Sequence, residues 1–320
     1  MKSLSKRFCT CLLLLCLAST AWAWPERPIR VIVPYGAGGM GDIVMRLLAE
    51  EMRAALGQTL VIENRPGAGG NIGAASVARA PADGYTFMVV PTNNLVVNQF
   101  LYKNLSFDPL KAFDPVTLLV QVPSVLFVHP QAGRNYADFA AQARASRGRM
   151  SYGSPGSGTT PHLSLQAINQ SQGLGMVHVP FQGAVPAMTS LLAQDIQAYI
   201  GGAGLGLQHV QAGKLVAVAV SADRRLPVLP DTPTFQEVGL GEIKAANWWA
   251  MVAPQGTKEE VIERMNAALR DAMRRPGVQE RFEKLGVLAS PMTPRATAQF
   301  LADEAVFWKK AVSDSGVSLD

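Results

Sequence analysis

Two stretches of small and hydroxylated residues have the composition of anion-binding loops. VPYGAGGMGD (33–42) follows an apolar run, and SYGSPGSGTTPH (151–162) precedes a helix expected to begin near Pro161. Each loop places backbone N–H groups at the start of a helix, where the helix dipole is positive. Thr159 or Thr160 is suited to cap the second helix. One such loop in each half of the chain predicts a shared site, in which a small diacid would place one carboxylate on each loop.

The first loop also has the spacing of a dinucleotide-binding motif. Gly36, Gly38 and Gly41 fit G-x-G-x-x-G, and Glu63 ends the next apolar run, where such proteins carry an acid for the ribose. Here Pro-Tyr separates the strand from the first glycine, whereas the dinucleotide motif runs from the strand directly into the loop. An exported dinucleotide-dependent oxidoreductase using Gly36–Gly41 is therefore the alternative interpretation.

The sequence contains no arrangement typical of catalysis. Ser154 directly follows Gly153, so the G-x-S-x-G elbow is not met, and no glycine-rich loop ends in Gly-Lys-Ser/Thr. His129, His178 and His209 are scattered, without metal-ligand spacing. We expect no enzyme activity, no catalytic residue, no metal site and no cofactor.

Four residues near the loops have structural interpretations beside the functional ones. Asp42 lies in a first helical turn, where an acid stabilises the helix start. His162 lies one turn into its helix and either contacts a carboxylate or orients its own loop. Trp248 and Trp249 alternate along a strand, so one is expected in a core and the other is left open.

The first 23 residues have the features of a signal peptide. Basic residues precede an apolar run, and Ala21-Trp22-Ala23 predicts cleavage before Trp24. The apolar run is shorter than the ~20 residues that span a bilayer. All the cysteines lie in this leader: Cys9, Cys11 and Cys16. We expect a soluble periplasmic protein without disulfides.

The charge of the expected mature chain is close to neutral. Three of the 29 Lys and Arg lie in the leader, which leaves an excess of two over the 24 Asp and Glu. Nucleic-acid binding needs a larger basic face, so we expect none.

Strand-like apolar runs alternate with amphipathic helical stretches, which is typical of α/β sheets that are mainly parallel. Helices follow one another at the C-terminal end, so the chain is expected to return to its first domain. The expected division is lobe 1 at 24–122 plus 248–320 and lobe 2 at 123–247. The strands are expected at 29–33, 59–63, 86–90, 124–128, 176–179, 196–200, 215–220 and 247–254, and the main helices at 42–56, 136–145, 261–275, 278–286 and 296–312.

Several motifs together resemble one family, the periplasmic Bug receptors of tripartite tricarboxylate transporters. The motifs are VPYGAGGMGD, LGQTLVIENRPGAGGNIGAASVARAPADGYT, YGSPGSGTTPH, HVPFQGAVPAMTSLLAQ and WWAMVAPQGT. The resemblance extends over the expected mature chain and implies a type II solute-binding fold that closes on a small carboxylate, without catalysis. It implies a membrane transporter as partner, and we expect a monomer.

The resemblance also indicates the binding residues. Its first loop falls on Tyr35, Gly38, Gly39, Met40 and Gly41, and its second on Ser154, Gly156, Ser157, Gly158, Thr159 and Thr160. We add His162 and Phe181, the latter for an apolar part of the pocket. Many relatives carry a hydroxyl residue in place of Gly41 and an acid near Gln197 and Gly201, so ligand choice is expected to differ here. A sensor that presents its ligand to a signalling partner is a further alternative.

Overall fold

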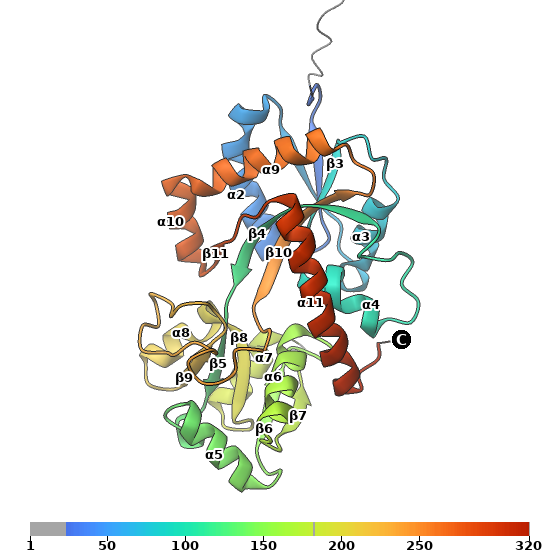
Figure 1. The fold of residues 1–320 in the computed structure, drawn as a ribbon. Helices are drawn as coiled ribbons and strands as arrows, with labels where there is room; N and C mark the ends of the chain where they lie inside the picture. Colours follow the sequence, from blue (N-terminus) through green and yellow to red (C-terminus); the bar gives the residue numbers. More distant parts are fainter. Residues whose placement is uncertain (1–23, 182, 320) are drawn as a thin grey trace, which may run out of the picture.

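The computed structural model describes residues 24–181 and 183–319, and the expected signal peptide lies outside them. Two mixed β-sheets flanked by helices lie one above the other in Figure 1, which confirms the expected α/β class. The first sheet has the order β11-β4-β10-β3-β1-β2 and the second β7-β6-β8-β5-β9. The first contains β1 (Ile29–Val33), β2 (Leu60–Asn64), β3 (Thr86–Pro91), β4 (Phe113–Val122), β10 (Asn247–Pro254) and β11 (Leu288–Ala289). The second contains β5 (Ser124–Val128), β6 (Ser151–Ser154), β7 (Val177–Pro180), β8 (Ala198–Gly202) and β9 (Val216–Val220).

Helices cover both faces of each sheet, with an apolar core on each face. On the first sheet, α2 (Met40–Leu56), α9 (Glu259–Arg274) and α10 (Pro276–Leu285) cover one face. The opposite face carries η1 (Ala68–Gly70), α3 (Asn71–Ala78), η2 (Asn93–Val97), α4 (Asn98–Leu101) and α11 (Pro294–Ser315). On the second sheet, η3 (Pro130–Ala132), α5 (Tyr136–Ser146) and α6 (Thr160–Ser171) lie on one face, and α7 (Ala184–Leu192) and α8 (Ala203–Gln211) on the other.

Most strands in each sheet run in one direction, with their C-terminal ends toward the other sheet. β5 pairs antiparallel with β8 and β9, and β10 pairs antiparallel with β3 and β4. The short β11 also runs antiparallel to β4. β5 and β10 are the strands by which the chain arrives from the opposite sheet (Figure 1). Such a strand begins where its neighbours end, so it must run against them. The crossing points therefore lie at the same edges as the strand C-termini.

Helix α11 connects the two halves on the side of the crossing strands (Figure 1). Its Trp308 lies in one apolar core with Trp248 of β10 and Leu163 of α6, and all three are buried. Further along, Nε2 of Gln170 donates to the carbonyl of Asp314 at 3.0 Å. A helix of the first sheet is thus packed against a helix of the second.

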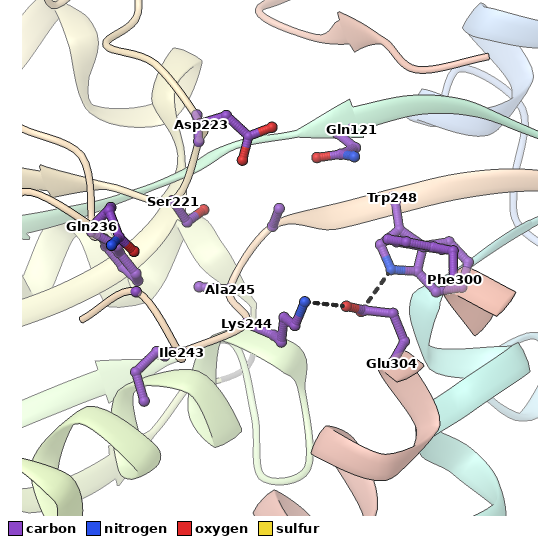
Figure 2. A pocket seen from close by; sticks show the side chains of 14 residues that line it. Gln121, Ser221, Asp223, Gln236, Ile243, Lys244, Ala245, Trp248, Phe300 and Glu304 are labelled. Atoms are coloured by element: carbon purple, nitrogen blue, oxygen red, sulfur yellow. Dashed lines mark hydrogen bonds and ion pairs between the residues drawn. The ribbon is translucent and has the colours of Figure 1, made fainter. Parts of the chain in front are cut away.

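Glu304 is the buried acidic residue of α11, at 3% exposed. Its Oε2 accepts hydrogen bonds from the indole nitrogens of Trp248 at 2.9 Å and Trp308 at 3.0 Å. Nζ of Lys244 lies 3.5 Å from Oε1, and Figure 2 shows this pair beside the crossing strand. The carbonyl of Lys244 accepts from Ser164 of α6 at 2.8 Å. The carboxylate therefore links α11, β10 and a segment anchored on the second sheet.

We predict that Glu304→Ala lowers the free energy of unfolding by about 3 kcal/mol, because two buried indole N–H groups lose their acceptor. The matched variant Lys244→Met should cost less than about 1 kcal/mol, since Lys244 is half exposed and Glu304 keeps both indole donors. Urea unfolding of both variants measures the difference. Equal losses would show that the indole bonds are not the dominant contribution.

Candidate binding cleft

A cavity of about 550 Å³ lies where the two sheets face each other. β3 ends there at Pro91, β4 at Val122 and β8 at Gly202. The crossing strands β5 and β10 begin there, at Ser124 and Asn247. In α/β sheets, ligands bind beyond the carboxyl ends of strands. The topology therefore places the candidate site at the crossing points.

Four helices begin at this cavity. The lining includes the first residues of α2, α6, α7 and α8, which are Met40, Thr160, Ala184 and Ala203. The first N–H groups of a helix have no partner within the helix, and its dipole is positive at that end. None of the described residues that line the cavity is charged. The cavity thus offers backbone donors and a positive potential, which suits a small anion.

The two predicted loops have the same backbone geometry, one in each half. Gly38 and Gly158 have φ of 79° and 77°, which favours glycine. The N-cap residues that follow, Gly39 and Thr159, have φ of −73° and −70° and ψ of 165° and 154°. The two loops, which are similar in composition, therefore also share one backbone conformation.

Each loop is closed by a side chain from the first turn of its own helix. The amide of Gly38 donates to Oδ2 of Asp42 at 2.9 Å, and the amide of Gly158 donates to Nδ1 of His162 at 3.1 Å. A hydrogen bond from Arg46 holds the pKa of Asp42 below its usual value. Burial, with His178 nearby, lowers the pKa of His162 to about 4. An ionised carboxylate closes the first loop and a neutral imidazole the second.

Three stacked rings lie next to the second loop and contact it through Ser154. The ring centroids of His162 and His178 are 3.8 Å apart, and those of His178 and Tyr152 are 5.1 Å apart. Oγ of Ser154 lies 2.7 Å from Nε2 of His178. This Ser–His contact was missed in the sequence because the residues lie on neighbouring strands. Ser154 is fully buried and also bonds Gly156, so the pair orients the loop.

The predicted site residues fall into two groups around the cavity. Tyr35, Met40, Thr159 and Thr160 line it. The others lie in or behind the same loops and are not among its lining residues: Gly38, Gly39, Gly41, Ser154, Gly156, Ser157, Gly158, His162 and Phe181. Gln197 lies elsewhere, where its Oε1 accepts from the amide of Ser151 at 2.8 Å.

Other lining residues were not identified from the sequence. They include Asn93, Tyr199, Asn247, Leu285 and the start of α8. The run GGAGLG (201–206) follows a predicted strand and opens a helix, so the pattern that identified the first two loops applies to it as well. Both tryptophans are buried, but Trp249, at 7% exposed, lines the cavity, whereas Trp248 packs away from it and donates to Glu304.

Two residues that the dinucleotide interpretation assigns to nucleotide binding, Glu63 and Gly41, instead contact other residues of the protein. Glu63 pairs with Arg30 at 2.8 Å and Arg65 at 3.1 Å. A side chain at Gly41 would overlap the ring of Trp249, so this glycine gives room to the indole. The acid and one of the three glycines thus have structural roles in the first lobe.

A second cavity, of about 410 Å³, lies beside the crossing segments (Figure 2). Its lining includes Asp223, Lys244 and Glu304, and the last two form the ion pair with α11.

Among residues 24–181 and 183–319, no group of His, Cys, Asp and Glu is arranged to hold a metal ion. In the same part of the chain, no helix combines the length and apolar character needed to cross a membrane.

We predict that the His162 imidazole makes the protein sensitive to mild acid. The unfolded chain takes up this proton near pH 6.5 and the folded chain only near pH 4. Stability from this group is therefore complete above pH 6.5 and falls by about 3 kcal/mol as the pH drops to 4.

His162→Asn keeps an acceptor for the Gly158 amide but cannot take up the proton. Thermal unfolding at a series of pH values should show a flatter profile for this variant between pH 6.5 and 4. Parallel profiles would show that His162 is not the titrating group.

The family described as the tripartite tricarboxylate transporter family receptor matches residues 44–317. BugT of Bordetella pertussis is 32% identical over 302 residues, which are 94% of this chain and 93% of BugT. The structure of R. palustris Rpa4515 with adipate is 29% identical with a TM-score of 0.76, covering 92% of this chain and 99% of that one.

MatC from Rhodopseudomonas palustris, solved with bound malate, is 31% identical with a TM-score of 0.72. The match covers 90% of this chain and all of MatC. These structures confirm the two-lobed periplasmic binding protein fold expected from the sequence. Family, relatives and fold agree over almost the whole described chain, which therefore belongs to the receptors of the tripartite tricarboxylate transporter family.

Proposed function

We propose that this protein is a periplasmic receptor that captures a small carboxylate between its lobes and delivers it to a tripartite tricarboxylate-type membrane transporter. The observation that carries the proposal is the cavity with four helix starts and no charged lining residue among those described. The adipate and malate bound by two structural relatives support a carboxylate as the ligand. The lobes comprise 24–122 plus 248–320 and 123–247, and the receptor acts as a monomer without catalysis.

The helix starts are the main source of binding energy that we propose for an anion. Each contributes up to about 2 kcal/mol to an anion in a partly buried site. Several of them together supply a large part of the roughly 8 kcal/mol that corresponds to a micromolar dissociation constant. Contacts to both lobes exist together only when the cleft is closed, so the ligand shifts the population toward the closed form that the transporter recognises.

We predict that Gly204→Asp weakens carboxylate binding by about 10- to 100-fold. Gly204 lines the cavity in the first turn of α8, and a side chain there meets open space. An acid in a first helical turn favours the helix, so the variant should fold. Repulsion between two carboxylates about 6 Å apart at the surface is on the order of 2–3 kcal/mol.

The matched control is Gly204→Asn, which has the same shape without the charge. Titration calorimetry with adipate and malate should give nearly native affinity for this control. Equal losses in the two variants would show that the added side chain acts by its bulk. Binding of NAD together with no binding of any carboxylate would contradict the proposed function and favour the dinucleotide enzyme.

We also predict that the exported protein begins at Trp24. This residue is 3% exposed, and its indole donates to the carbonyl of Gly84 at 3.0 Å, so the folded first lobe holds the expected new terminus. Intact mass of protein released from the periplasm measures the cleavage point. A mass that includes residues 1–23 would contradict the cleavage, and absence of the protein from the periplasmic fraction would contradict the proposed compartment.

A further inference from the structure

The two lobes present different surfaces to the cavity. From the first lobe, the lining is formed by the rings of Tyr35 and Trp249 with Met40 and Leu285. From the second, it is formed largely by the starts of α6, α7 and α8, together with the side chains of Tyr199 and Leu205. Three of the four helix starts therefore belong to the second lobe, whereas the contacting ring pair of Tyr35 and Trp249 belongs to the first.

Trp249 forms the centre of the first-lobe surface. A Cβ at Gly41 would overlap its benzene ring, so the indole rests directly on the first turn of α2. The Tyr35 ring meets the indole edge-on, with centroids 5.7 Å apart and an interplanar angle of 76°. The two rings make an apolar corner over the helix start, where the missing side chain of Gly41 provides the space.

The hydroxyl of Tyr35 is directed away from this corner. It lies 2.8 Å from Oδ1 of Asn94 and donates toward the carbonyl of Gly69 at 3.0 Å. Burial raises the pKa of Tyr35 to about 12, so the group stays neutral. The protein therefore uses the hydroxyl for its own structure, and the ring serves as an apolar wall.

The two equivalent loops also differ in the charge that closes them. Asp42 is 3% exposed and places its carboxylate at the start of α2, which compensates the positive end of that helix. Arg46 pairs with the other oxygen, but it lies one turn further along and is half exposed. At the equivalent place in the second lobe, His162 is uncharged. The second lobe is therefore the stronger anion site.

We infer that the ligand is a monocarboxylate with a planar apolar body, its carboxylate at the helix starts of the second lobe and its body against Trp249, Tyr35 and Met40. This inference rests on the proposed function and adds the chemical class of the ligand. A diacid with one carboxylate on each lobe would place its second charge against the indole and near Asp42. An aromatic acid places its ring there, where edge-to-face and stacking contacts are favourable.

Titration calorimetry with the full mature protein tests the inference. The probes are benzoate and phenylacetate as aromatic monocarboxylates, hexanoate as an aliphatic one, and succinate, malate and adipate as diacids. We expect the better aromatic acid to bind at least tenfold more tightly than any diacid. Hexanoate should fall between them, because it has an apolar body without a ring.

Variants of the aromatic corner locate the contact. Trp249→Leu should weaken the aromatic acid at least tenfold while changing diacid binding less than threefold. Gly41→Ala should give a similar loss by displacing the indole, and it keeps the full set of tryptophans. Phe107→Leu is the matched control, because Phe107 packs against Phe113 outside the cleft. Circular dichroism checks that each variant is folded, and Trp249→Phe replaces Trp249→Leu if the latter unfolds.

The outcomes separate this inference from the proposed function. Diacids that bind as tightly as the aromatic acids would overturn the inference and leave the carboxylate receptor standing. Aromatic acids that bind equally well to the native protein and to both the Trp249 and Gly41 variants would also overturn it. Failure of every carboxylate to bind would overturn both.

Discussion

The hydrogen bond that closes each glycine loop determines what the cleft can offer to a ligand. A glycine at positive φ directs its amide back toward the helix, where Asp42 or His162 accepts it. With that amide satisfied inside the protein, the donors that remain at the cavity are those of the first helical turn. The loops therefore work as rigid turns that aim a helix start, and the glycines need not touch the ligand. This explains why Met40 and Thr160 line the cavity while Gly38 and Gly158 lie behind it.

The same edge of the molecule carries both the candidate binding cavity and the connections between the lobes. β5 begins at Ser124 and β10 at Asn247, and both residues line the cavity. A ligand that contacts these residues acts directly on the segments that must bend when the lobes move. On the other side, the carboxylate of Glu304 joins α11 to Trp248 of β10 and to Lys244. Movement of the lobes is thus constrained by a buried acceptor next to a partly exposed ion pair.

Much of the regular part of the fold could be predicted from local patterns, although the long strand β4 (Phe113–Val122) was missed. The runs at 29–33, 124–128 and 247–254 coincide with β1, β5 and β10, because each is a short apolar segment bounded by turn residues. The sequence also indicated sheets that are mainly parallel, and most strands do share a direction. The reversed strands β5 and β10 follow from the path of the chain between sheets, which no local pattern encodes. Long-range pairing was the information that the sequence pattern lacked.

The site was predicted in part for the same reason. Glycine spacing identified the two loops, and the helix starts beside them line the cavity. The glycine spacing did not show which backbone N–H groups are already hydrogen-bonded within the protein. The Gly38 and Gly158 amides donate to Asp42 and His162, and these bonds are visible only in the folded structure. Nor did the spacing pair Ser154 with His178, whose contact depends on the parallel register of β6 and β7. Residue types alone therefore located the loops but not the atoms available to a ligand.

The difference between the loops changes how the two-lobed clamp is understood. The equal backbone geometry of the loops suggests equal roles, with one carboxylate on each. Charge breaks that equality, because Asp42 brings a carboxylate to one helix start and His162 brings a neutral ring to the other. Packing breaks it again, because Trp249 covers the first helix start in the space left by Gly41. The same fold can therefore hold different carboxylates when only the closing residue and the covering ring differ, while the strands and helix starts stay in place.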